Sequence, residues 1–491
     1  MRILSMIALV LVTIPSTAQK KVLKRIEAEV TGKDAGAHIS FLAADQMRGR
    51  NTGSPELDIA ANYIATQFKL YGVKSPPALK GYFQDVELQK IMKPTTGKFL
   101  IDTSAFTLGK DLLFVSGSSI DKQSDIVFAG YGSSEDFEKV AVKGKVVVVY
   151  AGAEGKADVG EALITLGPEK QSQAYSRGAI ALVEIFAIPG VPWQGISNFL
   201  SGQRLSMRPK IAGTIPHLWL RNSTRFGLSD LLKTKMSKGQ IELKVNPPIF
   251  IHSNNVIGVI EGTDPKLKNE WIAVSAHYDH VGVRRGVGDD SIYNGARDNA
   301  IGTVAVLESA RYFSRHPPKR SIAFIALTAE EVGLLGSAWY AEHPVIPLKQ
   351  TVFNFNCDGA GYNDTTLISV IDLNRTSTDQ ILKKAALSQG LVLKGDPAPE
   401  QKLYDRSDNA NFAMKGVPAV NISPGIKAFD QELFKYYHQP ADEYESLNMH
   451  YLQRFYRSFV YALYLLSAEP TKPTWKAGDK YEQAGKALYG M

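Results

Sequence analysis

Apolar residues form two patterns along the chain, and each pattern predicts one type of secondary structure. Apolar side chains at helical spacing predict helices over 54–72, 299–315 and 450–467. Continuous apolar runs of six or seven residues predict buried strands at WIAVSA (271–276), SIAFIAL (321–327), TVFNFNC (351–357) and VPAVNIS (417–423). Because strands and helices alternate from residue 251 onward, we predict an α/β fold, in which helices sandwich a mainly parallel mixed sheet.

A different pattern fills the middle of the chain, where short β-rich runs alternate with glycine turns. Examples are IVFAGYG after Asp125 and VVVVYAG after Lys145, and Asn246-Pro247-Pro248 ends the stretch as a linker. The alternative is that this segment merely extends the main sheet. The final segment shows no periodicity, so it either lies against the surface or forms a loose extension. The predicted organisation is a discontinuous domain at 19–97 and 249–468, a β-rich insertion at 98–248, and a C-terminal tail at 469–491.

The first residues have the order of features that is typical of an export signal. Arg2 precedes an apolar core that runs from Ile3 to Ile14, and the small residues Ser16-Thr17-Ala18 follow. This order predicts a signal peptide at 1–18, cleaved near Ala18, and a mature protein that is periplasmic or secreted; a buried N-terminal strand is the alternative. About 20 apolar residues are needed to cross a bilayer, and no stretch reaches that length, so we expect no stable membrane insertion.

Composition narrows the class of protein further. The 491 residues include 44% hydrophobic and 21% charged side chains, which is typical of globular proteins. The 56 basic and 49 acidic residues are spread along the chain, so the net charge of +7 forms no basic run and no nucleic-acid partner is expected. The single cysteine excludes an intramolecular disulfide and a thiolate-only metal site. A metal site made of histidines and carboxylates stays open.

Polar side chains that could perform chemistry gather where the predicted strands end. The carboxyl ends of strands in an open α/β sheet form the crevice where ligands bind, so residues distant in sequence converge there. These side chains are His277, Asp279, Asp298, Glu330, Glu331, Asp358 and His438, with Asp442 four positions further on. Buried carboxylates without partners are very costly, so several at one sheet edge require a shared cation. Two imidazoles and three or four carboxylates suit a pair of divalent ions, and nitrogen ligands favour zinc.

The motifs at these positions resemble those of one known family. They are HYDH (277–280), GARDN (295–299), AEE (329–331), NCDG (356–359) and YHQPAD (437–442). The resemblance is to the exported di-zinc aminopeptidases, a family that includes bacterial leucyl aminopeptidases, glutamate carboxypeptidase and transferrin-receptor-like proteins. It covers roughly 36–90 and 250–465, and it implies the zinc exopeptidase fold. The insertion resembles a protease-associated domain through VFAGYG and VKGKVVVVYAG, and many family members have this module at the same point.

The resemblance implies a set of ligands for two Zn²⁺ ions. His277 and Asp358 would bind one ion. Glu331 and His438 would bind the second, and Asp298 would bridge them.

The resemblance also implies roles for residues around the ions. Glu330 matches the general base that takes a proton from the attacking water and returns it to the leaving amine. Asp279 matches the carboxylate that orients the first imidazole, and Asp442 could serve the second in the same way. Tyr437 resembles a phenol that stabilises the oxyanion in some members, and a packed aromatic is an equal alternative. His280 is expected to support the ligands or to pack beside them.

The predicted function is that of an exported exopeptidase acting on peptides, first of all an aminopeptidase. A glutamate-type carboxypeptidase is the second hypothesis, and it needs cationic side chains for the terminal carboxylate of the substrate. Candidates are Arg284, Arg285, Arg297 and Arg406. A glutaminyl cyclase would use one zinc ion, and the presence of both His277 and Asp358 argues against it. A non-catalytic receptor would have lost ligands, whereas every matching position is intact.

Overall fold

The structure is a computed structural model that divides into two compact units. It describes residues 17–156, 159–201, 204–208, 214–222, 237–287, 290–359, 361–371 and 373–490. One unit joins Met1–Val86 to His252–Met491, and the other is Glu87–Ile251. The predicted signal peptide lies outside the described residues apart from positions 17 and 18. No helix among the described residues is long and apolar enough to cross a membrane.

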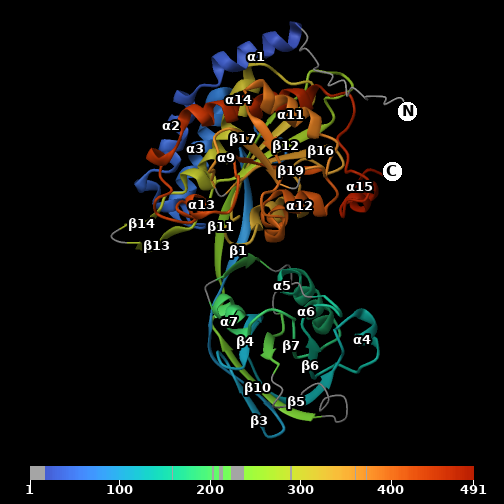
Figure 1. Ribbon diagram of the computed structural model, residues 1–491. Coiled ribbons are helices and arrows are strands. Elements are labelled where there is room, and N and C mark those ends of the chain that lie inside the picture. The colour runs from blue at the N-terminus through green and yellow to red at the C-terminus, as the bar shows by residue number, and fades with distance from the viewer. Residues whose placement is uncertain are drawn as a thin grey trace, which may run out of the picture. The chain divides into compact units, whose positions relative to one another are not determined.

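A mixed sheet forms the centre of the first unit (Figure 1). Among the described residues its order is β18-β17-β19-β16-β12-β15-β11-β1, and β8 pairs with the part of β1 that belongs to the second unit. The strands β12, β15, β16 and β19 run parallel to one another, so their carboxyl ends share one edge. The bounds are β1 Phe83–Ile91, β8 Arg204–Met207, β11 Ile249–Ile260, β12 Trp271–His277, β15 Ser321–Leu327, β16 Thr351–Cys357, β17 Leu367–Ile371, β18 Val392–Lys394 and β19 Ala419–Pro424.

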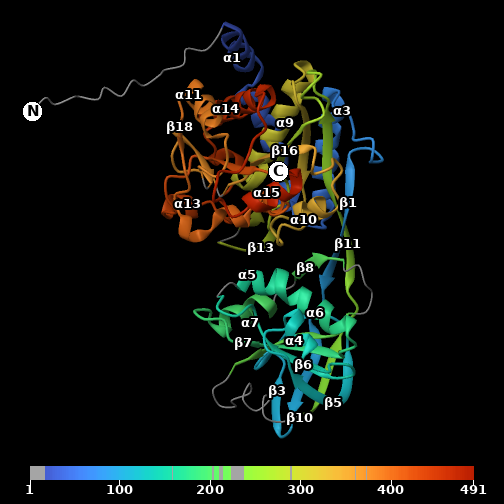
Figure 2. The same cartoon turned by 90° about the vertical axis from the view of Figure 1, so that its right-hand side faces the viewer.

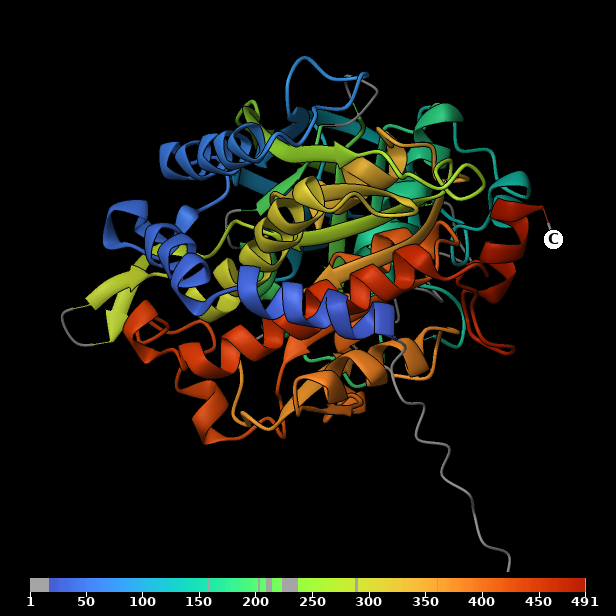
Figure 3. The ribbon, with the colours of Figure 1, turned by 90° about the horizontal axis from the view of Figure 1, so that it is seen from above.

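Helices cover both faces of this sheet, which explains why its central strands are apolar on both sides. The helices α2, α3, α9, α11 and α14 share one core cluster with one face, while α10 and α12 pack on the other. Helix α1 lies beside α14 (Figure 3). The bounds are α1 Thr17–Glu29, α2 Gly32–Leu42, α3 Pro55–Tyr71, α9 Ile301–Arg315, α10 Leu335–Glu342, α11 Asp379–Ser388, α12 Asn409–Met414, α13 Gln431–Phe434, α14 Met449–Ala468 and α15 Glu482–Tyr489. The predicted α/β class is confirmed.

Local signals in the sequence set the ends of α3. The Ser54 side chain accepts a hydrogen bond from the Leu57 amide and caps the first turn. Gly72 ends the helix with a φ of +77°, a left-handed conformation that costs glycine little. The prediction of a helix over 54–72 is therefore correct to within one residue at each end.

The C-terminal tail packs on the first unit, which is the first of the two alternatives expected for it. The Arg375 guanidinium lies over the rings of Tyr404, Trp475 and Tyr481 at 4.0, 5.6 and 5.2 Å from their centroids. Two of its nitrogens also donate to the Asp479 carboxylate at 2.7 and 3.0 Å. Trp475 is 7% exposed, so the tail adds to the hydrophobic core.

The second unit is built on another mixed sheet, with the order β3-β2-β10-β5-β6-β7-β9-β4. It also contains short helices that the predicted β-rich texture did not indicate. Its span of 87–251 encloses the predicted insertion at 98–248. The bounds are β2 Pro94–Ile101, β3 Ser104–Thr107, β4 Leu112–Ser116, β5 Ile120–Phe128, α4 Ser134–Glu138, β6 Val146–Tyr150, α5 Val159–Glu161, α6 Gly167–Ser176, β7 Ala181–Phe186, α7 Trp193–Ser201, β9 His217–Arg221 and β10 Ser237–Val245.

Charged side chains are buried together inside this second unit. Glu184 is fully buried on β7, and its carboxylate accepts from Lys170 Nζ at 2.8 Å and from Trp219 Nε1 at 3.1 Å. His217 Nε2 lies 2.6 Å from the same carboxylate. Burial alone would raise the pKa of Glu184, but His217 and Lys170 lower it below its ordinary value. Glu184 therefore stays charged as the common counter-ion of this cluster.

Replacing Glu184 with alanine should destabilise the second unit. Lys170 would lose its buried counter-charge, and His217 would lose its hydrogen-bond partner. Removing one partner of a buried ion pair costs about 3–5 kcal/mol. Hydrogen exchange followed by mass spectrometry should show lost protection in β6, β7 and β9. Glu242→Ala, at an exposed position on β10, is the matched control and should leave exchange unchanged. Wild-type protection in Glu184→Ala would contradict the importance of this cluster.

Candidate metal centre

A cleft opens at the edge of the sheet where the parallel strands end. Its volume is about 230 Å³. Its lining includes acidic and apolar side chains. The lining residues are Asp298, Glu330, Glu331, Asp358, Gly359, Ile371, Gln401, Leu403, Arg406, Ser407, Asn421, Ile426, Phe429, Phe434, Tyr437 and His438.

The topology brings the predicted ligands to this cleft from separate elements. His277 is the last residue of β12, and Asp358 directly follows β16. Glu331 lies four residues after β15, beyond Ala329, whose φ of +59° turns the chain sharply. Asp298 precedes α9, and His438 follows α13 with a φ of +51°. Such left-handed backbone is uncommon for residues other than glycine, and it is concentrated at functional sites.

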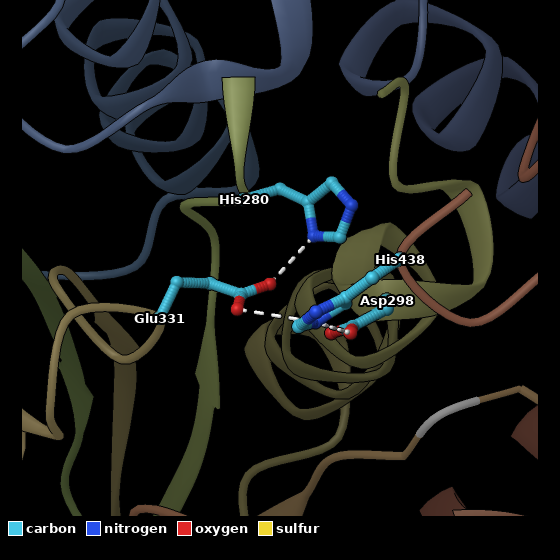
Figure 4. Close-up of side chains that lie close together, drawn as sticks. All are labelled: His280, Asp298, Glu331 and His438. Atoms are coloured by element: carbon cyan, nitrogen blue, oxygen red, sulfur yellow. Dashed lines mark hydrogen bonds and ion pairs between the residues drawn. The ribbon is translucent and has the colours of Figure 1, made fainter. Parts of the chain in front are cut away.

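Asp298 stands between the two imidazoles, and each of its oxygens faces one of them. Oδ1 lies 3.4 Å from His277 Nε2, and Oδ2 lies 3.1 Å from His438 Nε2. Each imidazole also meets a second carboxylate: Asp358 Oδ1 is 3.2 Å from His277 Nε2, and Glu331 Oε2 is 3.2 Å from His438 Nε2. Figure 4 shows the His438 half of this arrangement.

These separations fit a pair of tetrahedral metal ions. An ion held at about 2.0–2.1 Å by nitrogen and oxygen ligands places neighbouring donor atoms about 3.3 Å apart. The four donor–donor distances lie between 3.1 and 3.4 Å. The donor set is therefore suited to two divalent ions that share Asp298.

The electrostatics of the cleft favour positive charge. Burial lowers the pKa of His277, yet the nearby Glu330 and Asp358 raise it well above its ordinary value. Burial likewise opposes protonation of His438, but the hydrogen bonds that its ring donates to Asp298 and Glu331 raise its pKa to about 10. Without metal, both rings therefore carry protons at neutral pH and neutralise the acidic groups.

Asp279 fixes the backbone that carries the adjacent glutamates. It is fully buried, and its carboxylate accepts from the amides of Glu330 and Glu331 at 3.1 and 3.3 Å and from Thr52 Oγ1 at 2.9 Å. Its Oδ1 is 3.8 Å from His277 Nδ1, while the Asp279 carbonyl oxygen lies closer, at 3.2 Å. Asp279 therefore orients His277 chiefly through its backbone carbonyl, whereas the expected contact was through its carboxylate.

Asp442 likewise fixes the backbone of the segment that carries Asp298. Its buried carboxylate accepts from the amides of Arg297 at 2.9 and 3.1 Å and of Asp298 at 3.2 Å. Sequence reasoning offered it as a partner of His438, but these contacts place it against the bridging segment. The residue that it positions is thus Asp298.

Glu330 and Tyr437 both line the cleft. Burial and the charge of Asp358 raise the pKa of Glu330 well above its ordinary value, against the effect of His277. Burial raises the pKa of Tyr437 as well, so its hydroxyl is protonated at neutral pH and can donate a hydrogen bond. Its ring also packs on His438, with centroids 4.3 Å apart.

Two further buried residues lie beside the ligands: His280, which was expected to support them or to pack there, and Asp408, which was not predicted as part of the site. His280 Nδ1 lies 2.7 Å from Glu331 Oε1 (Figure 4). Asp408 is fully buried, and neither carboxylate oxygen has a hydrogen-bond partner among the described residues. Burial raises the pKa of Asp408 to about 7. The position of His280 within the HYDH motif indicated that it lies near the site. No motif around Asp408 distinguished it from a residue in a turn.

The arginines considered for a substrate carboxylate have different surroundings. Arg297 is buried between the rings of Tyr362 and Tyr436, 4.4 and 3.9 Å from their centroids. Arg284 donates to the Val281 carbonyl, and the Arg285 side chain lies outside the described part of the chain. Of the three whose side chains the structure describes, only Arg406 lines the cleft.

Comparison with known proteins identifies the domain that contains this cleft. Residues 255–463, which include every predicted ligand, match the model of peptidase family M28. This part of the chain is a family M28 peptidase domain. The predicted family and the predicted enzyme class, a peptidase, are thereby confirmed.

Relatives of the M28 domain include bacterial and fungal peptidases. Aminopeptidase YwaD of Bacillus subtilis is 26% identical over 414 residues, which cover 79% of this chain and 77% of that protein. A vacuolar membrane protease of Saccharomyces cerevisiae is 32% identical over 186 residues, 38% of this chain but only 17% of its own. The structure of an aminopeptidase from Aneurinibacillus sp. strain AM-1 covers 92% of this chain and 97% of its own, with 22% identity and a TM-score of 0.55. That likeness supports the fold.

Metal binding to the metal-free protein should release protons. Because His277 and His438 must lose their protons to act as ligands, binding of two ions at neutral pH should release at least about two protons. Calorimetric titration with Zn²⁺ in buffers of different ionisation enthalpy measures this number. Replacing the exposed His450 with alanine is the control and should not change it. Zinc binding without proton release would contradict the protonation of His277 and His438 in the metal-free protein.

Proposed function

We propose that this chain is an aminopeptidase that removes N-terminal residues from peptides with the help of two Zn²⁺ ions. The observation that carries the proposal is the position of Asp298, whose two oxygens each face one imidazole at a distance suited to a shared pair of ions. The M28 domain supports peptide hydrolysis. The name of the B. subtilis relative, an aminopeptidase, supports action at the N-terminus.

The proposed ligand assignment divides the donors into two sets. His277 and Asp358 hold one ion, Glu331 and His438 hold the other, and Asp298 is shared. When bound, the ions would polarise the scissile carbonyl and lower the pKa of a water molecule. A single-ion enzyme such as a cyclase would leave one imidazole and its carboxylate without a function.

Glu330 is the proposed general base. It lies beside the first ligand set, with Oε2 3.9 Å from His277 Nε2, and its side chain is 12% exposed toward the cleft. Glu330 takes a proton from the attacking water and returns it to the leaving amine. The Tyr437 hydroxyl lines the same cleft and donates a hydrogen bond to the developing oxyanion.

Replacing Glu330 with glutamine should separate catalysis from metal binding. The amide keeps the shape of the side chain but cannot accept the proton, so kcat should fall by about 10²–10⁴. Elemental analysis should still find two zinc ions per chain. Glu432→Gln, at an exposed position near the cleft, should retain full activity. Wild-type turnover in Glu330→Gln would refute the base assignment.

Carboxypeptidase activity is the second candidate function, and Arg406 favours it. This side chain lines the cleft and is exposed there. A guanidinium can bind a carboxylate through two parallel hydrogen bonds, so Arg406 could hold the C-terminus of a substrate.

A panel of peptides with free or acetylated N-termini distinguishes the two activities. An aminopeptidase needs the free amine, so acetylation should abolish cleavage while amidation of the C-terminus should not. Chromatography of the released amino acids measures the cleavage of each peptide. A carboxypeptidase would instead cleave the acetylated peptides but not those with an amidated C-terminus. The Arg406→Ala variant should then show weaker cleavage. This result would establish the second function.

The proposal includes the N-terminal segment and the second unit. The order of Arg2, the apolar core and the small residues up to Ala18 supports export to the periplasm or the medium. The phrases VFAGYG and VKGKVVVVYAG support a protease-associated domain in the second unit. We propose that this domain contacts substrate and has no chemistry of its own.

A further inference from the structure

His280 occupies a special position beside the candidate metal centre. It follows His277 by three residues, and its ring is buried, with 1% of the residue exposed. Its Nδ1 points to Glu331 and lies 2.7 Å from Oε1 (Figure 4). The resemblance assigned no ligand role to this residue.

The two oxygens of Glu331 have different partners. Oε2 faces His438 Nε2 at 3.2 Å, in the position suited to a metal ligand. Oε1 points away toward His280 at ordinary hydrogen-bond distance. The carboxylate thus has one oxygen for a metal ion and one for an imidazole.

The surrounding structure fixes the His280 ring in this orientation. A Cβ on Gly295 would lie 2.6 Å from two carbons of the ring, and the φ of +63° at this glycine also disfavours a side chain. The His438 ring meets the His280 ring edge-on, with centroids 5.5 Å apart. The His280 amide donates to the Arg50 carbonyl at 3.1 Å, which ties its backbone down as well.

The hydrogen bond defines which nitrogen of His280 carries the proton. An ionised carboxylate only accepts, so Nδ1 must donate to Oε1. The other nitrogen, Nε2, is buried and has no hydrogen-bond partner among the described residues.

We propose that His280 is a positioning residue that holds Glu331 as a one-oxygen ligand of the second metal ion. The inference rests on the proposed two-ion function and adds a residue to it. By occupying Oε1, His280 prevents the carboxylate from binding the ion through both oxygens. A coordination position then stays available for substrate. Partners of this kind orient a ligand and typically contribute 10–100-fold to metal affinity.

Two substitutions test this role. His280→Leu keeps much of the ring volume but removes the donor. His280→Asn retains an N–H group close to the position of Nδ1 and should rescue the hydrogen bond. The exposed His450→Leu is the matched control.

Cobalt titration of the metal-free variants gives a readout that does not depend on activity. Stepwise dissociation constants follow from competition with a chelator, and the visible absorption of Co²⁺ reports the geometry of each site. His280→Leu should bind the first ion normally and the second about 10–100-fold more weakly, with an altered spectrum for the second ion. His280→Asn should restore both.

Three outcomes would overturn the inference. Wild-type affinities and spectra in His280→Leu would show that the contact is dispensable. Failure of His280→Asn to improve on His280→Leu would point to direct ligation by the ring. Zinc-edge X-ray absorption on the unmodified holoenzyme should find an average of one imidazole nitrogen per zinc ion. An average of one and a half imidazole nitrogens per ion would also indicate direct ligation by His280.

The same experiments separate this inference from the proposed function. Wild-type protein that binds two ions and responds to the variants as expected, but cleaves no peptide, would refute only the aminopeptidase proposal. Protein that cleaves peptides but is indifferent to His280→Leu would refute only the role of His280. Binding of a single ion by the wild type would refute both.

Discussion

The candidate centre depends on the electrostatic cost of gathering acidic groups in a closed space. The side chains of Asp298, Glu330, Glu331 and Asp358 are between 6% and 13% exposed. Each negative charge there is poorly hydrated and repels the others, so the cluster is stable only when positive charge is present. Protons on the imidazoles provide that charge in the metal-free chain, and cations can replace them. The same donor atoms serve both states.

A second layer of carboxylates holds the backbone of the centre. Asp279 binds the amides of Glu330 and Glu331, and Asp442 binds those of Arg297 and Asp298. Amide hydrogen bonds stabilise a buried carboxylate without adding a further charge. Glu331 and Asp298 thereby keep their positions although loops are intrinsically mobile. His280 would extend this layer from backbone to side chain.

Much of the fold and most of the centre could be predicted because the relevant signals are local. Apolar runs define where β12, β15 and β16 end, and parallel topology then brings His277, Glu331 and Asp358 to one edge. Hydrogen-bond partners are not encoded in this way. Asp442 lies close to His438 in sequence, but its partners are the amides of Arg297 and Asp298, 145 and 144 positions away.

The same limit explains the tail and the inserted unit. The aromatic rings around Arg375 lie between 29 and 106 positions from it in sequence, so no period reveals their contact. The buried charges around Glu184 likewise converge from α6, β7 and β9. Such clusters form only when tertiary packing brings isolated polar residues together, and a single sequence shows each of them as an ordinary surface group.

The points where the chain leaves and re-enters the first unit have a consequence for how the second unit is inserted. β1 and β11 are neighbours in one sheet (Figure 2), with the Ile257 amide donating to the Tyr82 carbonyl at 2.7 Å and Asp85 within 3.1 Å of His252. The two crossing points are therefore close enough to be joined by a tight hairpin turn. A short turn in place of the second unit would leave the strands that carry the candidate ligands unchanged.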